Sequence, residues 1–359
     1  MPKFQIRLQI NDDDKSSKQV KVTAASKVTI NVVTIQRTLT ESCNIMKRFN
    51  SIVFALTAGC AFATSGYANI LVNDTWLDST RTDPASPVYA ENNGVTGTDA
   101  DADGNLESAW FKGGSGTMTA SPNDFQVTGI AGSTFWTTYF TPQATPVTLA
   151  NAGDAIKITW VFTPTGVAAA NTSQGFNLAL VQTPSSVSRL TADGSAPSGL
   201  YAGYAMFMNM GTTTLGNASP FNLKEWSAAS AGSLLGTAGN WGTSDGTGGT
   251  VGNTGFVSGQ SYTFVWTLTR TGAGLDITST MTGGSLNGSG SESVSYSDTT
   301  PQSYTYDTFA IRPSGSSVAA TQFDTSLFEV EFNPVPEPAT FALAGLGLLG
   351  LVFARRARR

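Results

Sequence analysis

Apolar and polar residues alternate with a period of two along much of residues 69–333, and this pattern commits the body of the chain to β-strands with one buried face. Thr, Val and aromatic residues fill the alternating runs, as a pleated surface favours, while Gly, Asn, Asp and Ser separate them. The clearest apolar faces are those of Ile156, Ile158, Trp160 and Phe162, of Tyr262, Phe264, Trp266 and Leu268, and of Phe328, Val330 and Phe332. We therefore expect an all-β body.

The number and spacing of these runs predict how the strands are organised. Roughly a dozen runs occur at the spacing expected of a sandwich or barrel, and no long amphipathic helix interrupts them. Residues 69–333 also show no obvious linker, so we expect a single domain, a two-sheet β-sandwich. The sequence Thr-Gly-Ala-Gly from Thr271 to Gly274 predicts a hairpin turn between two of the strands.

Three stretches late in the body resemble a known fold. They read YTFVWTLTRTGAGLDITSTMTGG from residue 262, YDTFAIRPSG from residue 306 and FDTSLFEVEF from residue 323. Their strand rhythm resembles that of the concanavalin-like lectin and glucanase jelly roll. The resemblance implies a jelly-roll sandwich, and it implies either carbohydrate binding or glycan hydrolysis.

The composition of the chain excludes several classes of function. Its 359 residues include no His, which excludes His-based catalytic triads, His-ligated metals and imidazole acid–base chemistry. Residues 69–333 carry 7 Lys and Arg against 20 Asp and Glu, a net charge near −13. A surface that acidic repels phosphate backbones, so we expect no nucleic-acid partner.

A secretory signal peptide is predicted over residues 46–68. Lys47 and Arg48 supply a basic n-region, an apolar stretch follows, and the segment ends in a small-x-small cleavage site at Ala68. An alternative cut follows Ala63, and a buried core helix is the alternative to a signal. The segment implies export through the Sec translocon.

The residues before this signal need a separate explanation, because a signal peptide normally begins the chain. We predict that translation starts at Met46 and that residues 1–45 are an over-called upstream extension; a long n-region of a functional precursor is the alternative. Both cysteines, Cys43 and Cys60, fall outside the body, so the mature protein would have neither disulfides nor thiol chemistry. A lipoprotein with lipidated Cys60 is a further alternative, although Thr57 stands where an aliphatic residue is expected.

The C-terminal segment, residues 334–359, has three parts. It opens with a proline-rich stretch containing Pro336, Glu337 and Pro338, continues with 16 small or apolar residues, and ends in a basic cluster. Sixteen helical residues span roughly 24 Å, slightly less than the hydrocarbon core of a bilayer, so we expect a short transmembrane helix. The basic cluster predicts a cytoplasmic end for this helix, and its arginines are Arg355, Arg356, Arg358 and Arg359.

This order of Pro-Glu-Pro, glycine-rich apolar span and arginine cluster resembles the PEP-CTERM protein-sorting signal. The resemblance implies that exosortase, a membrane cysteine transpeptidase, recognises the tail and removes it near the Pro-Glu-Pro motif. It also implies a Gram-negative, exopolysaccharide-making host and delivery to the cell surface or extracellular matrix. An ordinary C-terminal membrane anchor is the alternative.

One acidic stretch, Asp-Ala-Asp-Ala-Asp-Gly-Asn-Leu-Glu at residues 99–107, predicts a cation site. Carboxylates at alternate positions can converge on one ion, and the glycine permits the sharp turn that such a loop needs. A helix–loop–helix calcium site has a bidentate Glu at the twelfth position, where this sequence has Trp110, so a further ligand must come from elsewhere. We expect either a structural Ca²⁺, the one cofactor considered, or a solvated acidic turn. The candidate ligands are Asp99, Asp101, Asp103, Asn105 through its backbone carbonyl, and Glu107.

Trp241 is the candidate for contact with a sugar. It lies in the Gly- and Thr-rich stretch 236–255, which we expect to be a long flexible loop, and an exposed indole can stack on the apolar face of a sugar ring. The alternative is that Trp241 folds back and pins its own loop. Trp226 is a weaker candidate of the same kind.

A glycanase would need two carboxylates about 5–5.5 Å apart for retention, or about 6.5–9.5 Å apart for inversion. The nearest pattern is Glu329-Val330-Glu331, which lacks the middle carboxylate of the Glu-x-Asp-x-Glu arrangement of lectin-like glucanases. Glu329 and Glu331 alternate with an apolar face, so we expect them in solvent, and no spacing supports Glu107 or Glu225. We therefore expect no catalytic residues and no enzyme activity.

Together these features predict an exported surface or extracellular-matrix protein that is sorted by exosortase. Its sandwich would be structural or adhesive and would bind polysaccharide through its loops. The expected partners are exosortase, the Sec translocon, exopolysaccharide and, transiently, the inner membrane. The alternative function is a glycanase on the same fold.

Overall fold

The computed structural model divides into two compact units, Met1–Thr64 with Pro338–Arg359 and Ser65–Glu337. It describes residues 7–10, 20–23, 29–30, 68–83, 89–91, 99, 101–169, 171–195, 197–212, 214–227, 231–235, 238–313 and 318–335. In the first unit the described residues form a three-stranded antiparallel sheet of β1 (Arg7–Ile10), β2 (Val20–Thr23) and β3 (Thr29–Ile30). The predicted signal segment before Ala68 and the tail from Pro336 lie outside the described residues.

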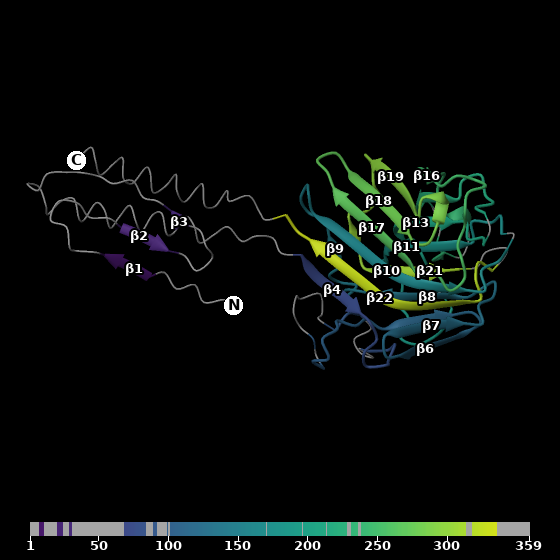
Figure 1. Ribbon diagram of the computed structural model, residues 1–359, viewed down its shortest axis with the longest axis horizontal. Helices are drawn as coiled ribbons and strands as arrows, with labels where there is room; N and C mark the ends of the chain where they lie inside the picture. Colours follow the sequence, from purple (N-terminus) through teal and green to yellow (C-terminus); the bar gives the residue numbers. More distant parts are fainter. Residues whose placement is uncertain are drawn as a thin grey trace, which may run out of the picture. The chain divides into compact units, whose positions relative to one another are not determined.

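The larger unit contains an eight-stranded antiparallel sheet, which Figure 1 shows from β19 across to β6. The hairpin turn predicted at Thr271 joins two of its strands, because the Thr271 amide donates a hydrogen bond of 2.8 Å to the carbonyl of Gly274. In order across the sheet, the strands are β19 (Ser291–Asp298), β18 (Leu275–Thr282), β17 (Tyr262–Arg270), β10 (Ala155–Thr165), β22 (Gln322–Asn333), β7 (Asp124–Thr128) and β6 (Thr117–Ser121), with β4 (Asn69–Asp74) also paired to β22.

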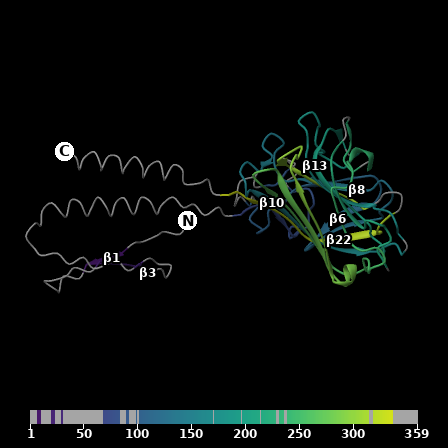
Figure 2. The same ribbon diagram turned by 90° about the horizontal axis from the view of Figure 1, so that it is seen from above.

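A seven-stranded antiparallel sheet forms the second layer of this unit, and Figure 2 shows its strands β13 and β8 above β6 and β22 of the first sheet. In order, its strands are β16 (Gly246–Gly248), β14 (Phe221–Glu225), β13 (Ala202–Met208), β11 (Phe176–Gln182), β21 (Thr308–Arg312), β8 (Phe135–Tyr139) and β5 (Trp110–Gly113). The smaller elements are the pairs β12 (Ser198–Gly199) with β15 (Gly232–Ser233) and β9 (Val147–Thr148) with β20 (Thr305–Tyr306), and the 3₁₀ turns η2 (Ala238–Asn240) and η3 (Leu286–Gly288).

The hydrophobic core fills the space between the two sheets. The apolar faces predicted for β10 and β17 point into it, and they meet residues such as Leu178 of β11 and Met206 of β13 from the other sheet. Trp160 and Trp266 are fully buried, and the Trp160 ring stacks on Phe162 with 4.1 Å between ring centroids. Aromatic pairs at this distance add to the stabilisation from area burial. The strand pairing and the shared core confirm the predicted all-β, two-sheet sandwich.

The seven-stranded sheet is buried on its outer face as well, where the alternating pattern predicts solvent. Val181 of β11 and Phe207 of β13 point outward, yet both are buried in a second apolar cluster. Long connections fold over this face and supply Tyr201, Trp226 and Leu235 to the same cluster. The periodicity of a strand does not reveal such coverage, because the covering residues come from distant loops.

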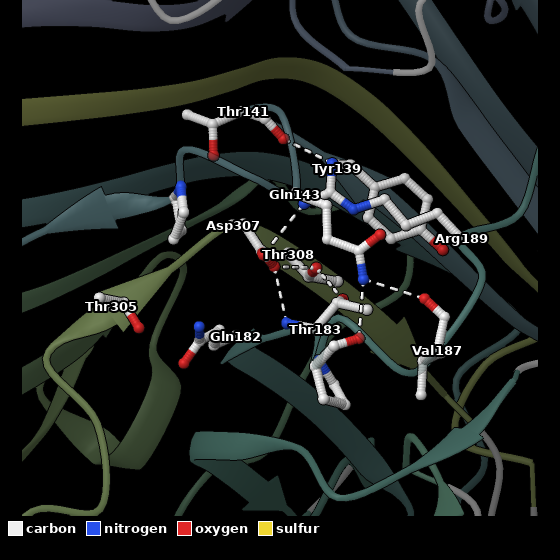
Figure 3. A network of polar contacts seen from close by, with 12 residues as sticks. Tyr139, Thr141, Gln143, Gln182, Thr183, Val187, Arg189, Thr305, Asp307 and Thr308 are labelled. Carbon is white, nitrogen blue, oxygen red and sulfur yellow. Dashed lines mark hydrogen bonds and ion pairs between the residues drawn. The ribbon is translucent and has the colours of Figure 1, made fainter.

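A buried ion pair lies near one end of this covered face (Figure 3). The Arg189 Nη2 atom lies 3.0 Å from the Asp307 Oδ2 atom, and both side chains are almost fully buried. The Arg189 guanidinium also sits 4.7 Å from the Tyr139 ring centroid, and it donates to the carbonyl of Thr141 at 2.5 Å. Arg189 therefore anchors the connection between β11 and β12 to the sheet beneath it.

The other carboxylate oxygen of Asp307 completes this network. Asp307 Oδ1 accepts hydrogen bonds from the Thr183 amide at 2.8 Å and from the Thr308 hydroxyl at 2.6 Å. Burial raises the pKa of Asp307 above its ordinary value, although the charge of Arg189 acts to lower it. The pair thus depends on Arg189 to keep a fully buried carboxylate ionised.

Among the residues that the structure describes, no helix is long and apolar enough to cross a membrane. The predicted transmembrane segment begins after Pro338 and so falls in the part of the chain that is not described. The membrane helix therefore stays a prediction from the sequence.

Candidate cation site

The acidic stretch 99–107 lies against the first strand of the body. An isolated β-bridge joins Asn73 of β4 to Leu106, with the Asn73 amide donating to the Leu106 carbonyl at 2.9 Å and the return bond at 3.2 Å. Because β4 pairs with β22 at the centre of the eight-stranded sheet, this bridge fixes the end of the acidic stretch to the sandwich.

Within the stretch, carboxylates fold the backbone into consecutive turns. Asp99 accepts hydrogen bonds from the amides of Ala102 at 2.6 Å and Gly104 at 2.9 Å, so its carboxylate closes the loop. Asp103 accepts from the amide of Asn105 at 2.7 Å. Gly104 has a φ of +98°, which a glycine adopts without the strain that a side chain would impose. The glycine thus provides the sharp turn that the sequence pattern predicts.

Five carboxylates gather here in two groups that share one member. Single oxygen atoms of Asp99, Asp101 and Asp103 lie within 4.8 Å of one another, and so do oxygen atoms of Glu91, Asp101 and Glu107. Glu91 is held beside the loop because its backbone amide donates to the Glu107 carbonyl at 3.1 Å. Oxygen atoms at this separation can share a cation, since Ca²⁺ binds oxygen at about 2.3–2.6 Å.

Glu107 is the most deeply buried of these acids. It is 2% exposed, and among the described residues no donor is hydrogen-bonded to either of its carboxylate oxygens. A buried carboxylate is costly unless it is paired, neutralised or bound to a metal ion. Asn105 is also buried, and its side-chain oxygen accepts a hydrogen bond of 3.0 Å from the Thr75 hydroxyl. The backbone carbonyl of Asn105 stays a predicted ligand.

The ionised carboxylates of the site repel one another. Burial first, and then the neighbouring carboxyls of Glu91, Asp74 and Asp103, together raise the pKa of Glu107 to about 9. Burial likewise raises the pKa of Asp74, a 1% exposed residue whose carboxylate accepts from the Trp76 amide at 2.7 Å. The site therefore has a strongly negative potential, which a divalent cation would relieve.

The structure brings together most of the predicted ligands and adds one. Asp99, Asp101 and Asp103 converge as the alternating pattern predicts, and Glu107 joins them through Asp101. Glu91 is the candidate for the ligand from elsewhere, which the sequence pattern requires because Trp110 stands at the twelfth position. No spacing rule identifies Glu91, because its backbone hydrogen bond to Glu107 is a tertiary contact that no local pattern contains.

Trp241 does not present an exposed face to a sugar in this structure. Its indole is 4% exposed and packs edge-to-face on Trp226 at 5.1 Å and on Phe207 at 5.9 Å between ring centroids. Trp226, the weaker candidate, is 1% exposed. The two indoles pack on the outer face of the seven-stranded sheet, where they shield its apolar side chains from water. The alternative interpretation of Trp241, that it pins its own loop, describes its position.

The carboxylates considered for glycan hydrolysis contact other groups. Glu331 forms an ion pair of 2.5 Å with Lys157, and Glu329 lies beside it on the outer face of β22, half-buried rather than in free solvent. Burial and the charge of Glu331 raise the pKa of Glu329 to about 7. Glu225, at the end of β14, accepts a hydrogen bond of 2.7 Å from the Gln302 amide. Glu107 belongs to the acidic site.

The class of the body is defined by its two stacked antiparallel sheets, and the tail adds a specific motif. Residues 334–359 match the PEP-CTERM protein-sorting motif, so the sorting residues predicted in the sequence, Pro336 to Pro338 and the terminal arginines, lie within the matched segment. No curated protein matches the sequence significantly.

Several solved lectin structures are similar to the chain. The basic winged bean lectin with Tn-antigen is 9% identical, with a TM-score of 0.36 over 62% of this chain and 90% of that one. The Ca²⁺/Man2-bound exoplasmic/lumenal domain of VIP36 is 10% identical, with a TM-score of 0.36 over 65% and 84% of the two chains. The Lotus tetragonolobus seed lectin is 12% identical, with a TM-score of 0.34 over 64% and 94%. At these TM-scores the two-sheet architecture rests on the strand pairing of this chain itself.

Proposed function

We propose that this chain is the precursor of an exported protein that exosortase recognises through residues 334–359. The match of these residues to a protein-sorting motif is the observation that carries the proposal. After export through the Sec translocon, the apolar part of the tail would hold the precursor in the inner membrane. Exosortase would then cut near Pro336 and deliver the body to the cell surface or extracellular matrix of a Gram-negative host.

A fractionation experiment tests the sorting proposal. The change is Pro336→Ala, Glu337→Ala and Pro338→Ala together in the native, exopolysaccharide-making host. We expect the unaltered protein at the cell surface or in the matrix, and the variant in the inner membrane. A variant that reaches the surface in the same amount as the unaltered protein would overturn the proposal.

The body, on this proposal, is structural or adhesive and has no catalytic activity of its own. Support comes from the surroundings of its acidic residues. Glu331 is ion-paired with Lys157, and Glu107 lies in a cluster of carboxylates that suits a structural cation. A structural Ca²⁺ in the 99–107 loop is part of the proposal, because buried, unpaired carboxylates need a counter-charge.

The outer face of β17, β18 and β19 is the surface that we propose contacts polysaccharide. These strands are side by side at one edge of the eight-stranded sheet (Figure 1), and their register aligns the outward side chains in rows. One row, for example, is Thr267, Thr278 and Ser295. Hydroxyl residues fill all but two of the outward positions, and the full set is Thr263, Val265, Thr267, Thr269, Asp276, Thr278, Thr280, Thr282, Ser291, Ser293, Ser295 and Ser297.

The chemistry of this face, named here the hydroxyl face, suits a neutral polysaccharide. Side chains repeat about every 4.8 Å across the strands and about every 6.7 Å along them, so donors and acceptors recur over a flat area. Asp276 is the only charged residue among its twelve positions. Each hydroxyl contact exchanges water for sugar and yields about 1 kcal/mol or less, so affinity would come from many contacts along a polymer.

Removing hydroxyls while keeping the shape of the strands tests this surface. Thr278→Val, Thr280→Val, Ser293→Ala and Ser295→Ala together should reduce retention on the host's immobilised polysaccharide at least several-fold. Thr117→Val and Thr119→Val, at exposed positions on the opposite edge of the same sheet, provide the matched control and should leave retention unchanged. Equal losses in both variants would contradict the assignment of the hydroxyl face. Turnover of the polysaccharide, abolished by Glu225→Gln, would instead favour the glycanase alternative.

A further inference from the structure

The acidic site contains more carboxylates than one divalent ion would neutralise. Five of them lie in its two groups, and with all five ionised, as ligands of a cation are, one Ca²⁺ would leave a net charge of −3 in a partly buried region. Uncompensated like charges at short range are strongly unfavourable where solvent screening is reduced. A second positive charge in the same region would lower this repulsion.

The geometry separates the carboxylates into two candidate positions. Asp99 and Asp103 belong only to the loop group, and Glu91 and Glu107 belong only to the other group. Each group by itself places three carboxylate oxygens within 4.8 Å of one another, as ligands of one ion must lie. Asp101 belongs to both groups. Its carboxylate has two oxygens, so each oxygen can contact a different ion.

Glu107 gives the second position independent support. Its carboxylate is 98% buried, receives no donor hydrogen bond on either oxygen from the residues that the structure describes, and has an oxygen within 4.8 Å of those of Glu91 and Asp101. An ion bound in the loop group would leave this carboxylate without a direct counter-charge. A cation between Glu91, Asp101 and Glu107 would supply one.

We propose that the site binds two Ca²⁺ ions, one among Asp99, Asp101 and Asp103 and a second among Glu91, Asp101 and Glu107. This inference rests on the proposed structural Ca²⁺ and adds the second ion. The donors are all oxygens, which favours a hard cation such as Ca²⁺ over softer metals. Asp101 bridges the two ions, so that the loop and the segment containing Glu91 are held by a common centre.

The number of bound ions tests the proposal directly. The protein secreted by its host is freed of metal with EGTA, reloaded with Ca²⁺, and examined by native mass spectrometry and calorimetric titration. We expect two Ca²⁺ ions in the unaltered protein and one in either Glu107→Gln or Asp99→Asn. Asp101→Asn should weaken both. Asp78→Asn, which removes a nearby charge outside both groups, is the matched control and should keep two ions.

Folding is checked separately so that loss of binding can be interpreted. Glu91→Gln changes a less buried member of the second group and should reproduce the Glu107→Gln result without emptying the loop group. Far-ultraviolet circular dichroism should show that each variant keeps its β structure. One ion in the unaltered protein would overturn the second site while leaving the proposed function intact. No bound ion would overturn the calcium part of the proposed function as well.

Discussion

At the residue scale, two Arg–Asp pairs among the described residues have different surroundings. Arg189 and Asp307 are 6% and 0% exposed and lie 3.0 Å apart, whereas Arg81 and Asp193 are 23% and 34% exposed at 2.8 Å. The distances are nearly the same, so the burial of the charges decides what each pair contributes. Removing one partner of a buried pair leaves an uncompensated charge, while a surface pair contributes little.

Arg189→Met should therefore lower the free energy of unfolding by about 3–5 kcal/mol, because Asp307 would be buried without its partner. Arg81→Met, the matched control at the more exposed pair, should lower it by about 1 kcal/mol or less. Urea denaturation followed by tryptophan fluorescence measures both. If the two substitutions lower the free energy of unfolding equally, burial does not make the Arg189–Asp307 pair more important for stability.

Sequence reasoning at this scale succeeds where the pattern is local and fails where contacts are distant. The Asp99–Asp103 alternation and Gly104 predict a loop that closes on itself, and the structure has it. Glu91 is missed because its hydrogen bond to the Glu107 carbonyl is a tertiary contact. Trp241 lies in a stretch whose composition suggests exposure, but the apolar surface that covers it belongs to other strands.

At the element scale, alternation identifies the faces of single strands correctly. The apolar faces of β10 and β17 are buried as predicted. The outer faces of β11 and β13 are not predictable in the same way, because loops rather than neighbouring strands bury them. The order of strands within each sheet also depends on long-range pairing, such as that of β22 with β4, β7 and β10, which no local pattern contains.

The two glutamates on β22 lead to a prediction about pH. The pKa of Glu329 is about 7 in the folded protein, against an ordinary value of 4.5. Between these values the unfolded chain has lost this proton while the folded chain keeps it, so stability should fall as pH rises from 4.5 to 7. For Glu331, burial acts to raise the pKa, but the Lys157 hydrogen bond lowers it overall. The stabilisation that Glu331 contributes to the folded state is therefore lost only as pH falls below 4.5.

Glu329→Gln should remove this fall in stability. The expected gain relative to the unaltered protein is on the order of 1–2 kcal/mol at pH 8, allowing for solvent screening, and close to zero at pH 4. Thermal unfolding across this pH range measures the difference. A variant whose stability falls with pH as steeply as that of the unaltered protein would show that another group is responsible.

At the scale of the whole molecule, the chain combines a β-sandwich body with a C-terminal sorting motif. The sandwich follows from alternation over some 265 residues, and the motif follows from the order of its three parts in 26 residues. The body has a cluster of carboxylates near β4 and a hydroxyl face at one edge of the larger sheet. The tail determines where these surfaces would be displayed.

The most direct test of this account is the intact mass of the protein isolated from its native host. We predict that the mature protein has lost the signal segment up to Ala68 and the tail beyond the region of Pro336. The variant with alanine at positions 336, 337 and 338 should keep its tail. A native protein that retains Arg359 would contradict the account, because its tail would then be a plain membrane anchor.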